Sequence, residues 1–211
     1  MSKNVLTYGD AFIGDSLEVG VAVMASVLGG QLTIPALVTP VNAVLATGGV
    51  LAYVNVTNPT ATKKVTIPNG DGTSAVYTFV AAVAVAGDVK VGASADATMT
   101  NLERAINKSG GTEGVSGDYM SFGGAAHPLV SAAINAGADS IALTVLTKGV
   151  VGNIDITTDE ASITPTDPTG GVDGTVGSLG DVRVDAGNIY VCTADNTSAG
   201  QNWKAVAISA I

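Results

Sequence analysis

The stretch "VKVGASADATMTNLERAIN", residues 89–107, predicts the one clear helix of this chain and thereby its fold class. Ser94 is a good N-cap, and Asp96 lies in the first turn, where the helix dipole favours an acidic side chain. Three apolar residues then recur at helical spacing and form one narrow stripe: Met99, Leu102 and Ile106. This pattern indicates a helix that covers one face of a sheet.

The end and the polar side of this helix are also readable. Arg104 and Lys108 lie near the C-terminal end, and Gly110 and Gly111 are predicted to stop the helix. Its polar face combines Thr100, Asn101, Glu103 and Lys108. Because these side chains form no convergent catalytic set, we expect the helix to serve packing.

The rest of the chain is typical of short antiparallel strands. Apolar residues make up 46% of it but aromatic residues only 4%, and 27 glycines supply turns. The segment "KKVTIPNGDGTSAVYTFVAA" alternates on both sides of a turn at residues 69–72 and predicts a hairpin. Further strands are expected at residues 130–134, 141–146 and 154–156, although "VSAAINAG" also fits a short helix.

We expect four regions in this mainly β chain of α+β type. Residues 1–57 read as an N-terminal arm with apolar β segments, an anchor or subunit interface. Residues 58–158 read as a central β-rich domain with its helix near 95–108. Residues 159–178 have no periodicity and are rich in Pro, Gly, Asp and Thr, which predicts a linker. Residues 179–211 predict a small β-hairpin unit that is too small to bury a core alone.

The charge pattern excludes some partners. With 18 acidic and 9 basic residues the net charge is −9, which argues against nucleic-acid binding. No charged residue occurs from Val19 to Thr62, but Gly29-Gly30, Pro35 and acidic flanks argue against a membrane span. We therefore expect this stretch to be buried by other protein, such as a neighbouring subunit.

Candidate chemical groups are few. His127 is the only histidine and lies in a Gly-rich loop, with no Ser or Cys partner in a recognisable motif. Cys192 excludes an intrachain disulfide, as expected of folding in a reducing cytoplasm, and reads as a small buried residue. The segment "NGDGTS", residues 69–74, looks oxygen-rich, but Val80 stands where a calcium loop needs its glutamate.

No phosphate loop, dinucleotide fingerprint or hydrolase motif occurs in the chain, and the acidic run "DEASITPTDPTGGVD" reads as solvated linker. We therefore predict no enzyme activity, no catalytic residues, no cofactor and no metal site.

The order of these elements resembles a module of tailed-bacteriophage virion proteins. In that module a hairpin, a strand leading into a helix that begins near "A-x-A-T-x-x-N-L", and a closing hairpin ending in "K-x-G-x-x-G-N" follow one another. The matching positions are Ala95, Ala97, Thr98, Asn101, Leu102, Lys148, Gly149, Gly152 and Asn153.

The tail "GDVRVDAGNIYVCTADNTSAGQNWKAVAIS" looks like a C-terminal hairpin of phage fibre and decoration proteins. It matches at Gly180, Arg183, Tyr190, Val191, Cys192, Trp203 and Lys204. Together the two resemblances cover about half to two-thirds of the chain, and residues 1–57 match nothing we can name.

The resemblance implies a structural component of a virion. Among such components we predict a capsid decoration protein, of cement or head-fibre type, made in the host cytoplasm and bound to the outer surface of the head. Its partners would be the major capsid protein or another virion protein, and copies of itself in a homo-oligomer, which we expect to be a trimer. A tail tube or tail-fibre component is the alternative. A carbohydrate-binding adhesin, with Trp203, Tyr190 or Tyr119 as stacking platforms, is a further alternative.

Overall fold

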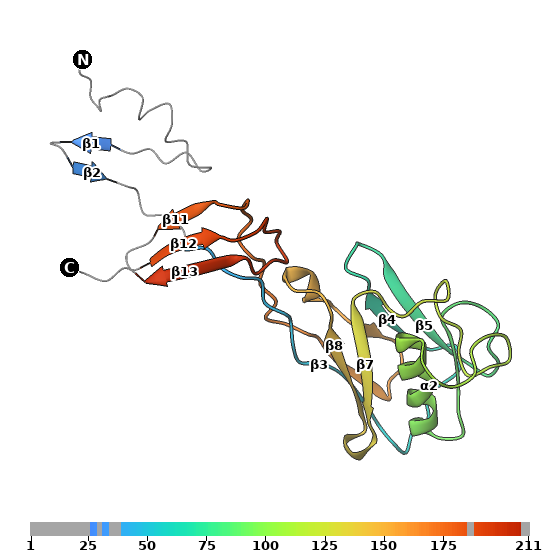
Figure 1. Cartoon of the computed structure of the whole chain (residues 1–211). Helices are drawn as coiled ribbons and strands as arrows, with labels where there is room; N and C mark the ends of the chain where they lie inside the picture. The colour runs from blue at the N-terminus through green and yellow to red at the C-terminus, as the bar shows by residue number, and fades with distance from the viewer. Residues whose placement is uncertain (1–25, 29–30, 34–38, 185–187, 208–211) are drawn as a thin grey trace. The chain divides into compact units, whose positions relative to one another are not determined.

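The computed structural model describes residues 26–28, 31–33, 39–184 and 188–207 of the chain. Two compact units result, which we call the central unit, Ala43–Asp173, and the terminal unit, Met1–Asn42 with Gly174–Ile211. The predicted fold class is confirmed: the described residues are mainly β, with short, mostly antiparallel strands and one α-helix (Figure 1).

The central unit contains two four-stranded sheets. The first has the order β10-β3-β8-β7, and the second has the order β6-β5-β4-β9, in which only the β5–β6 pair is parallel. The strands of the first sheet are β3 (Gly49–Tyr53), β7 (Val130–Asn135), β8 (Ser140–Val145) and β10 (Ile163–Thr166). Those of the second are β4 (Lys64–Pro68), β5 (Ser74–Val80), β6 (Asp88–Lys90) and β9 (Thr157–Thr158).

One hydrophobic core joins the two sheets and the helix. Each sheet turns alternate side chains inward, as the period-two geometry of a strand requires. Inward side chains of the first sheet include Leu51, Ile141 and Leu143, and those of the second include Tyr77 and Phe79, all nearly inaccessible to solvent. With few aromatic residues, the core depends on close packing of aliphatic side chains.

Helix α2 (Ala95–Asn107) begins as the sequence predicts. Ser94 has extended backbone angles, and its side chain accepts a hydrogen bond from the Ala97 amide. The predicted stripe of Met99, Leu102 and Ile106 is fully buried in the core. Truncating one such side chain to Ala costs about 2–5 kcal/mol of unfolding free energy.

Two details of the helix differ from the sequence prediction. The helix ends at Asn107, and Lys108 takes the left-handed conformation at the C-cap, with φ 49°, two residues before the expected stop at Gly110 and Gly111. Asn101, expected on the polar face, is buried at 6% exposure because its Nδ2 donates to the Lys90 carbonyl, 3.0 Å away.

Both edges of the first sheet are protected against pairing with another chain. At one edge β10 carries Pro165, which has no amide hydrogen to offer. At the other edge Asn107 imitates a strand: its Nδ2 donates to the Ala132 carbonyl at 2.7 Å, and its Oδ1 accepts from the Ala132 amide at 2.8 Å. The last residue of α2 thus covers the edge of β7 at Ala132.

The predicted hairpin and the strands around residues 130–134 and 141–146 are confirmed as β4–β5, β7 and β8, so the short-helix alternative for "VSAAINAG" is wrong. The strand expected at residues 154–156 is absent; pairing begins only at Thr157. Ile154 and Ile156 are nonetheless buried, because the apolar pattern reports burial and not strand pairing.

Two predicted boundaries cut through a sheet. Residues 163–166, expected in a linker at 159–178, form β10 and pair with β3. β3 itself falls in the stretch 1–57, which we expected to be an arm with apolar β segments that serves as an anchor or subunit interface, and it is an interior strand of the central unit. The pairing of these two segments joins residues more than a hundred positions apart, so no local sequence signal marks it.

The described part of the terminal unit is small. It contains the predicted C-terminal strands as a sheet of β11 (Val182–Val184), β12 (Asn188–Cys192) and β13 (Trp203–Ala207). A separate hairpin joins β1 (Ser26–Leu28) to β2 (Gln31–Thr33). Most of residues 19–37, the first part of the uncharged stretch 19–62, lies outside the described residues, as does the predicted turn at 185–187.

Replacing Asn107 with Ala removes both hydrogen bonds to Ala132 and is expected to lower the unfolding free energy by about 2 kcal/mol. Urea unfolding measures this loss, and hydrogen exchange at the Ala132 amide should accelerate. The matched control is Asn135→Ala. Asn135 is an exposed asparagine on β7, the strand that contains Ala132, and its replacement should change stability little. A stable Asn107→Ala protein with unchanged exchange at Ala132 would contradict this role.

Candidate functional site

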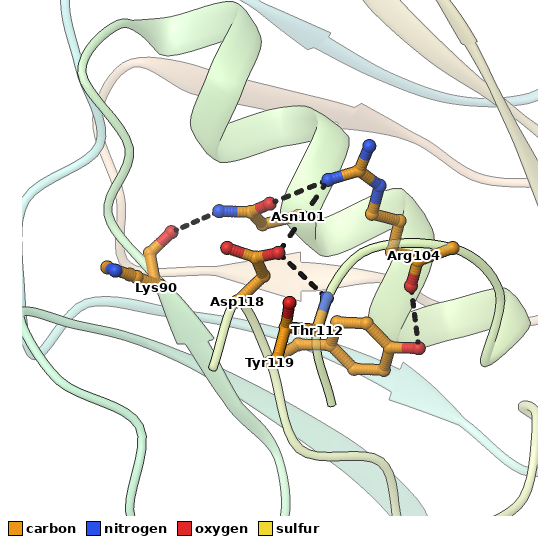
Figure 2. A network of polar contacts seen from close by, with 7 residues as sticks. Lys90, Asn101, Arg104, Thr112, Asp118 and Tyr119 are labelled. Atoms are coloured by element: carbon orange, nitrogen blue, oxygen red, sulfur yellow. Dashed lines mark hydrogen bonds and ion pairs between the residues drawn. The ribbon is translucent and has the colours of Figure 1, made fainter. Parts of the chain in front are cut away.

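A network of polar side chains joins helix α2 to the loop that follows it. Figure 2 shows Asp118 between Arg104 of the helix and the backbone of Thr112. Asp118 Oδ2 accepts a hydrogen bond from the Thr112 amide at 2.8 Å, and Arg104 Nη1 lies 4.0 Å from the same oxygen. Tyr119 Oη donates to the Gly110 carbonyl at 3.2 Å.

The loop also bonds to the edge of the second sheet. The Lys90 amide donates to the Asp118 carbonyl at 2.9 Å, and the Met120 amide donates to the Asp88 carbonyl at 2.9 Å. Tyr119 is buried between these two bonds, which raises the pKa of its hydroxyl through desolvation. The loop therefore lies on β6 much as another strand would.

A second ion pair holds the loop to the C-cap of the helix. Lys108 Nζ lies 3.1 Å from Glu113 Oε2, while the hydroxyl and the amide of Ser121 both donate to Glu113 Oε1. The hydrogen bonds from Ser121, and then the one from Lys108, lower the pKa of the Glu113 carboxyl. Lys108 thus ends the helix and anchors the loop at one position.

A groove of about 480 Å³ lies beside this network, and Lys90, Asn101, Arg104 and Asp118 are among the residues that line it. Its polar groups bond to one another and to the backbone, as Figure 2 shows. The lining also includes the hydroxyl of Thr100, and the carboxylate of Asp118 is bonded to the Thr112 amide and paired with Arg104. Arg104 and Asp118 are each about a third exposed, so this ion pair contributes little stability and the arrangement serves to position the loop.

The residues that carry the family resemblance have architectural positions. Thr98 Oγ1 donates to Asn58 Oδ1 at 2.6 Å and accepts from the Gly92 amide at 2.8 Å, which ties the start of α2 to the chain before β4. Asn153 repeats the pattern of Asn107: it donates to the carbonyl of Gly171 at 2.9 Å and accepts from its amide at 2.8 Å.

His127 is a buried loop residue. Its Nδ1 accepts hydrogen bonds from the amides of Leu129 and Val130, each at 3.2 Å, and its Nε2 lies 3.4 Å from the Ile67 carbonyl. Burial lowers the pKa of the imidazole, so it is neutral in the folded protein at neutral pH. An apolar pocket of about 290 Å³ adjoins it, with Phe122 on its wall.

The other candidate groups are structural as well. Cys192 is fully buried, as predicted, and its thiol lies 3.0 Å from the Ala194 carbonyl. In the segment 69–74, Asp71 Oδ1 accepts hydrogen bonds from the amide and the hydroxyl of Thr73, which is the geometry of a turn. Trp203 and Tyr119, two of the suggested stacking platforms, are each 3% exposed and present no ring to a sugar.

An uncharged surface covers the outer side of the first sheet, and the sequence did not reveal it. Strand register places its residues in rows, and the central row runs across Thr166, Val50, Ala142 and Ala133. We call this surface, completed by Ala52, Thr144 and Thr164, the neutral face. None of the four strands contains an Asp, Glu, Lys or Arg residue.

The neutral face is unusual for a surface that meets water. On a sheet face that meets water, the outward positions normally carry polar and charged side chains. Such charges also discourage association with other proteins. Here the exposed positions are Ala and Thr, and the adjoining Val54 and Leu146 are 49% and 55% exposed. A surface of small, uncharged residues admits close approach by another protein.

Comparison with known proteins finds no matching family model, no matching curated protein and no matching solved structure. Within residues 26–28, 31–33, 39–184 and 188–207, no cluster of three or more His, Cys, Asp or Glu side chains is arranged to hold a metal ion. No helix among these residues is long and apolar enough to span a membrane.

The neutral, buried state of His127 predicts a pH dependence of stability. In the unfolded chain the imidazole of His127 gains a proton near pH 6.5, whereas in the folded chain its pKa is lower. The unfolding free energy is therefore highest above that pH and falls as the pH drops below it, by at most about 1.4 kcal/mol per pH unit. Urea unfolding between pH 5 and 7 measures this slope.

His127→Asn is the control, because an Asn oxygen can still accept from the Leu129 and Val130 amides. Since the chain has a single histidine, this variant should lose the slope between pH 5.5 and 6.5. An equal slope in both proteins would show that another group is responsible.

Proposed function

We propose that this protein is a structural component of a tailed-bacteriophage virion, a capsid decoration protein bound to the outer surface of the head. The observation that carries the proposal is the neutral face. A protein of net charge −9 that keeps a whole four-stranded sheet free of charge presents an assembly surface to another protein. The major capsid protein is the proposed partner.

The position of the resemblance residues supports the same reading. The polar side-chain atoms of Thr98, Asn101 and Asn153 form hydrogen bonds with the backbone and, at Thr98, with the neighbouring Asn58 side chain. A module whose shared residues maintain a framework suits a protein with a passive, mechanical role, since nothing in such a set needs to meet a substrate. The ion pairs around Asp118 and Glu113 likewise hold a loop in place.

Chemistry also favours assembly through uncharged contacts. Covering a face of Ala, Thr and Val avoids the large desolvation cost of charged groups, because no charge has to be removed from water. A tail tube or fibre component would use the same physics. The two roles differ in the particle that binds the protein: heads for a decoration protein, tails for the alternative.

Co-sedimentation with tail-less phage heads prepared without this protein tests the proposal. We expect saturable binding at hundreds of copies per head, in a multiple set by icosahedral symmetry. Absence of binding to heads, with binding to tails or assembly into tubes, would replace the decoration role by the tail role. Absence of binding to either would remove the virion assignment.

Ala142→Lys places a charge at the centre of the neutral face and is expected to weaken head binding at least about tenfold, since a buried unpaired ammonium is costly. Ala82→Lys, at an exposed alanine in a loop of the same unit, is the matched control and should bind as the unmodified protein does. Equal binding by both variants would show that the neutral face is not the contact surface.

A further inference from the structure

The pocket beside His127 is formed by the turn of the β4–β5 hairpin and the loop at residues 122–128. Its volume is about 290 Å³, and most of its wall is apolar, from Ala75, Phe122, Ala125, Ala126 and Pro128. None of the described residues that line it is an Asp, Glu, Lys or Arg. An apolar wall with a few polar groups is the usual composition of a small-molecule site, and such sites begin at about 300 Å³.

The aromatic part of this wall is held in place by the fold. The Phe122 ring packs edge-to-face on Tyr77, with 5.4 Å between the ring centres and 76° between the ring planes. Gly87 lies against the same ring, since a Cβ at that position would come within 2.7 Å of Phe122 Cζ. Phe122 nevertheless remains 36% exposed. The ring is therefore fixed but incompletely covered, and such preorganisation lowers the entropy cost of binding a ligand.

His127 supplies a hydrogen-bond donor in this pocket. Because its Nδ1 accepts from the Leu129 and Val130 amides, the proton of the neutral imidazole is assigned to Nε2. Among the described residues, the acceptor for this N–H is the Ile67 carbonyl at 3.4 Å, which is longer than the usual distance of about 2.9 Å. A side chain that is only 4% exposed thus has a donor that the protein satisfies weakly.

Asn69 supplies an acceptor on the same lining. Thr73 Oγ1 donates to Asp71 Oδ1, so it accepts from Asn69 Nδ2 at 2.8 Å, and this assigns the orientation of the Asn69 amide. Asn69 Oδ1 is buried and has no hydrogen-bond partner among the described residues. A buried carbonyl oxygen without a partner is destabilising, and a bound molecule with a donor would relieve this cost.

The donor and the acceptor lie near one another. Ile67, whose carbonyl faces His127 Nε2, precedes Asn69 by two residues, about 7 Å along an extended backbone. A neutral amide carries a carbonyl oxygen and an N–H side by side, and with two hydrogen bonds of about 2.9 Å it spans such a separation.

Other ligand chemistries fit these groups less well. A carboxylate would bring its charge toward Asn69 Oδ1 with no cation on the wall, and an ammonium group would find no anion there. A hydrocarbon would leave the polar groups of both His127 and Asn69 without a partner. The lining therefore favours an uncharged ligand that both donates and accepts.

We propose that this pocket binds a small neutral molecule that carries an amide on an apolar ring. The amide carbonyl accepts from His127 Nε2, the amide N–H donates to Asn69 Oδ1, and the ring packs on Phe122. A volume of about 290 Å³ suits one ring and its amide. The inference stands on this pocket alone and does not depend on binding to phage heads.

NMR titration of the nitrogen-15-labelled full chain with benzamide tests the proposal. We expect saturable shifts of the backbone amide signals of Ala125, Ala126 and His127, with a Kd in the millimolar range, as a ligand of about nine non-hydrogen atoms allows. Benzoate has the same shape but a negative charge, and methyl benzoate lacks the N–H donor. Both should bind at least about tenfold more weakly than benzamide.

Ala126→Leu places a larger side chain on the pocket wall at an exposed position and should abolish the benzamide shift at His127. Ala82→Leu, at an exposed alanine outside the pocket, is the matched control and should bind benzamide as the unmodified protein does. The dispersion of the same spectra reports whether each variant is folded. If Ala126→Leu disturbs the fold, the comparison of the three probes on the unmodified protein still decides.

The absence of saturable shifts with benzamide in the unmodified protein would overturn the proposal and leave water as the occupant of the pocket. Benzoate or methyl benzoate binding as tightly as benzamide would overturn it too, as would undiminished binding by a folded Ala126→Leu protein. Any of these results would leave the decoration role intact, because head binding is measured separately and is proposed to use the neutral face.

Discussion

The packing of helix α2 against the inner sides of the two sheets is the interaction on which the central unit depends. Met99, Leu102 and Ile106 are fully buried in the same core as inward residues such as Leu51 and Phe79. Because the chain has few aromatic residues, most of this core is aliphatic and depends on close packing of the helix stripe against the sheets. The position of the helix in turn fixes Asn107 against β7 and Arg104 near Asp118.

In this chain of few charged residues, backbone N–H and C=O groups outside the sheets and the helix need hydrogen-bond partners. Side-chain amides, hydroxyls and a few carboxylates supply them. Asn107 and Asn153 each pair with both polar groups of one distant residue, as a neighbouring strand would. The carboxylate of Glu160 accepts from the Thr60 amide and from Ser162; burial raises its pKa, but these hydrogen bonds outweigh burial and lower it overall. With its backbone groups satisfied in this way, the first sheet has no charged side chain in its four strands.

Local features of the fold were predictable from sequence. The N-cap at Ser94, the apolar stripe of α2 and the turn of the β4–β5 hairpin depend on residues close together in the chain. The pairing of β10 with β3 was not predictable, because it joins distant segments and because Pro165 and the surrounding Thr and Gly residues are typical of a linker. The strand predicted at Ile154 and Ile156 is wrong for a different reason. The spacing of apolar residues indicates that the side chains are buried but does not establish that the backbone pairs in a sheet.

The polar network and the neutral face could not be recognised from the sequence for a related reason. Nothing in the sequence near Asn107 indicates that its side chain meets Ala132, and Asp118 looks like any acidic loop residue until the loop is seen on β6. The neutral face appears only when register brings four separate strands into rows. The sequence does show that each of these strands lacks charged residues. It does not show which of their side chains face outward, and this becomes clear only when the inner side of the sheet is known.

The central claim is that the neutral face is covered when the protein is in place. Carbene footprinting of the free and the head-bound protein, read by mass spectrometry, tests it most directly. We predict that labelling of the segment that contains β7 and β8 falls on binding, while labelling of the exposed loop around Ala82 stays the same. Saturated binding to heads with undiminished labelling of β7 and β8 would contradict the account.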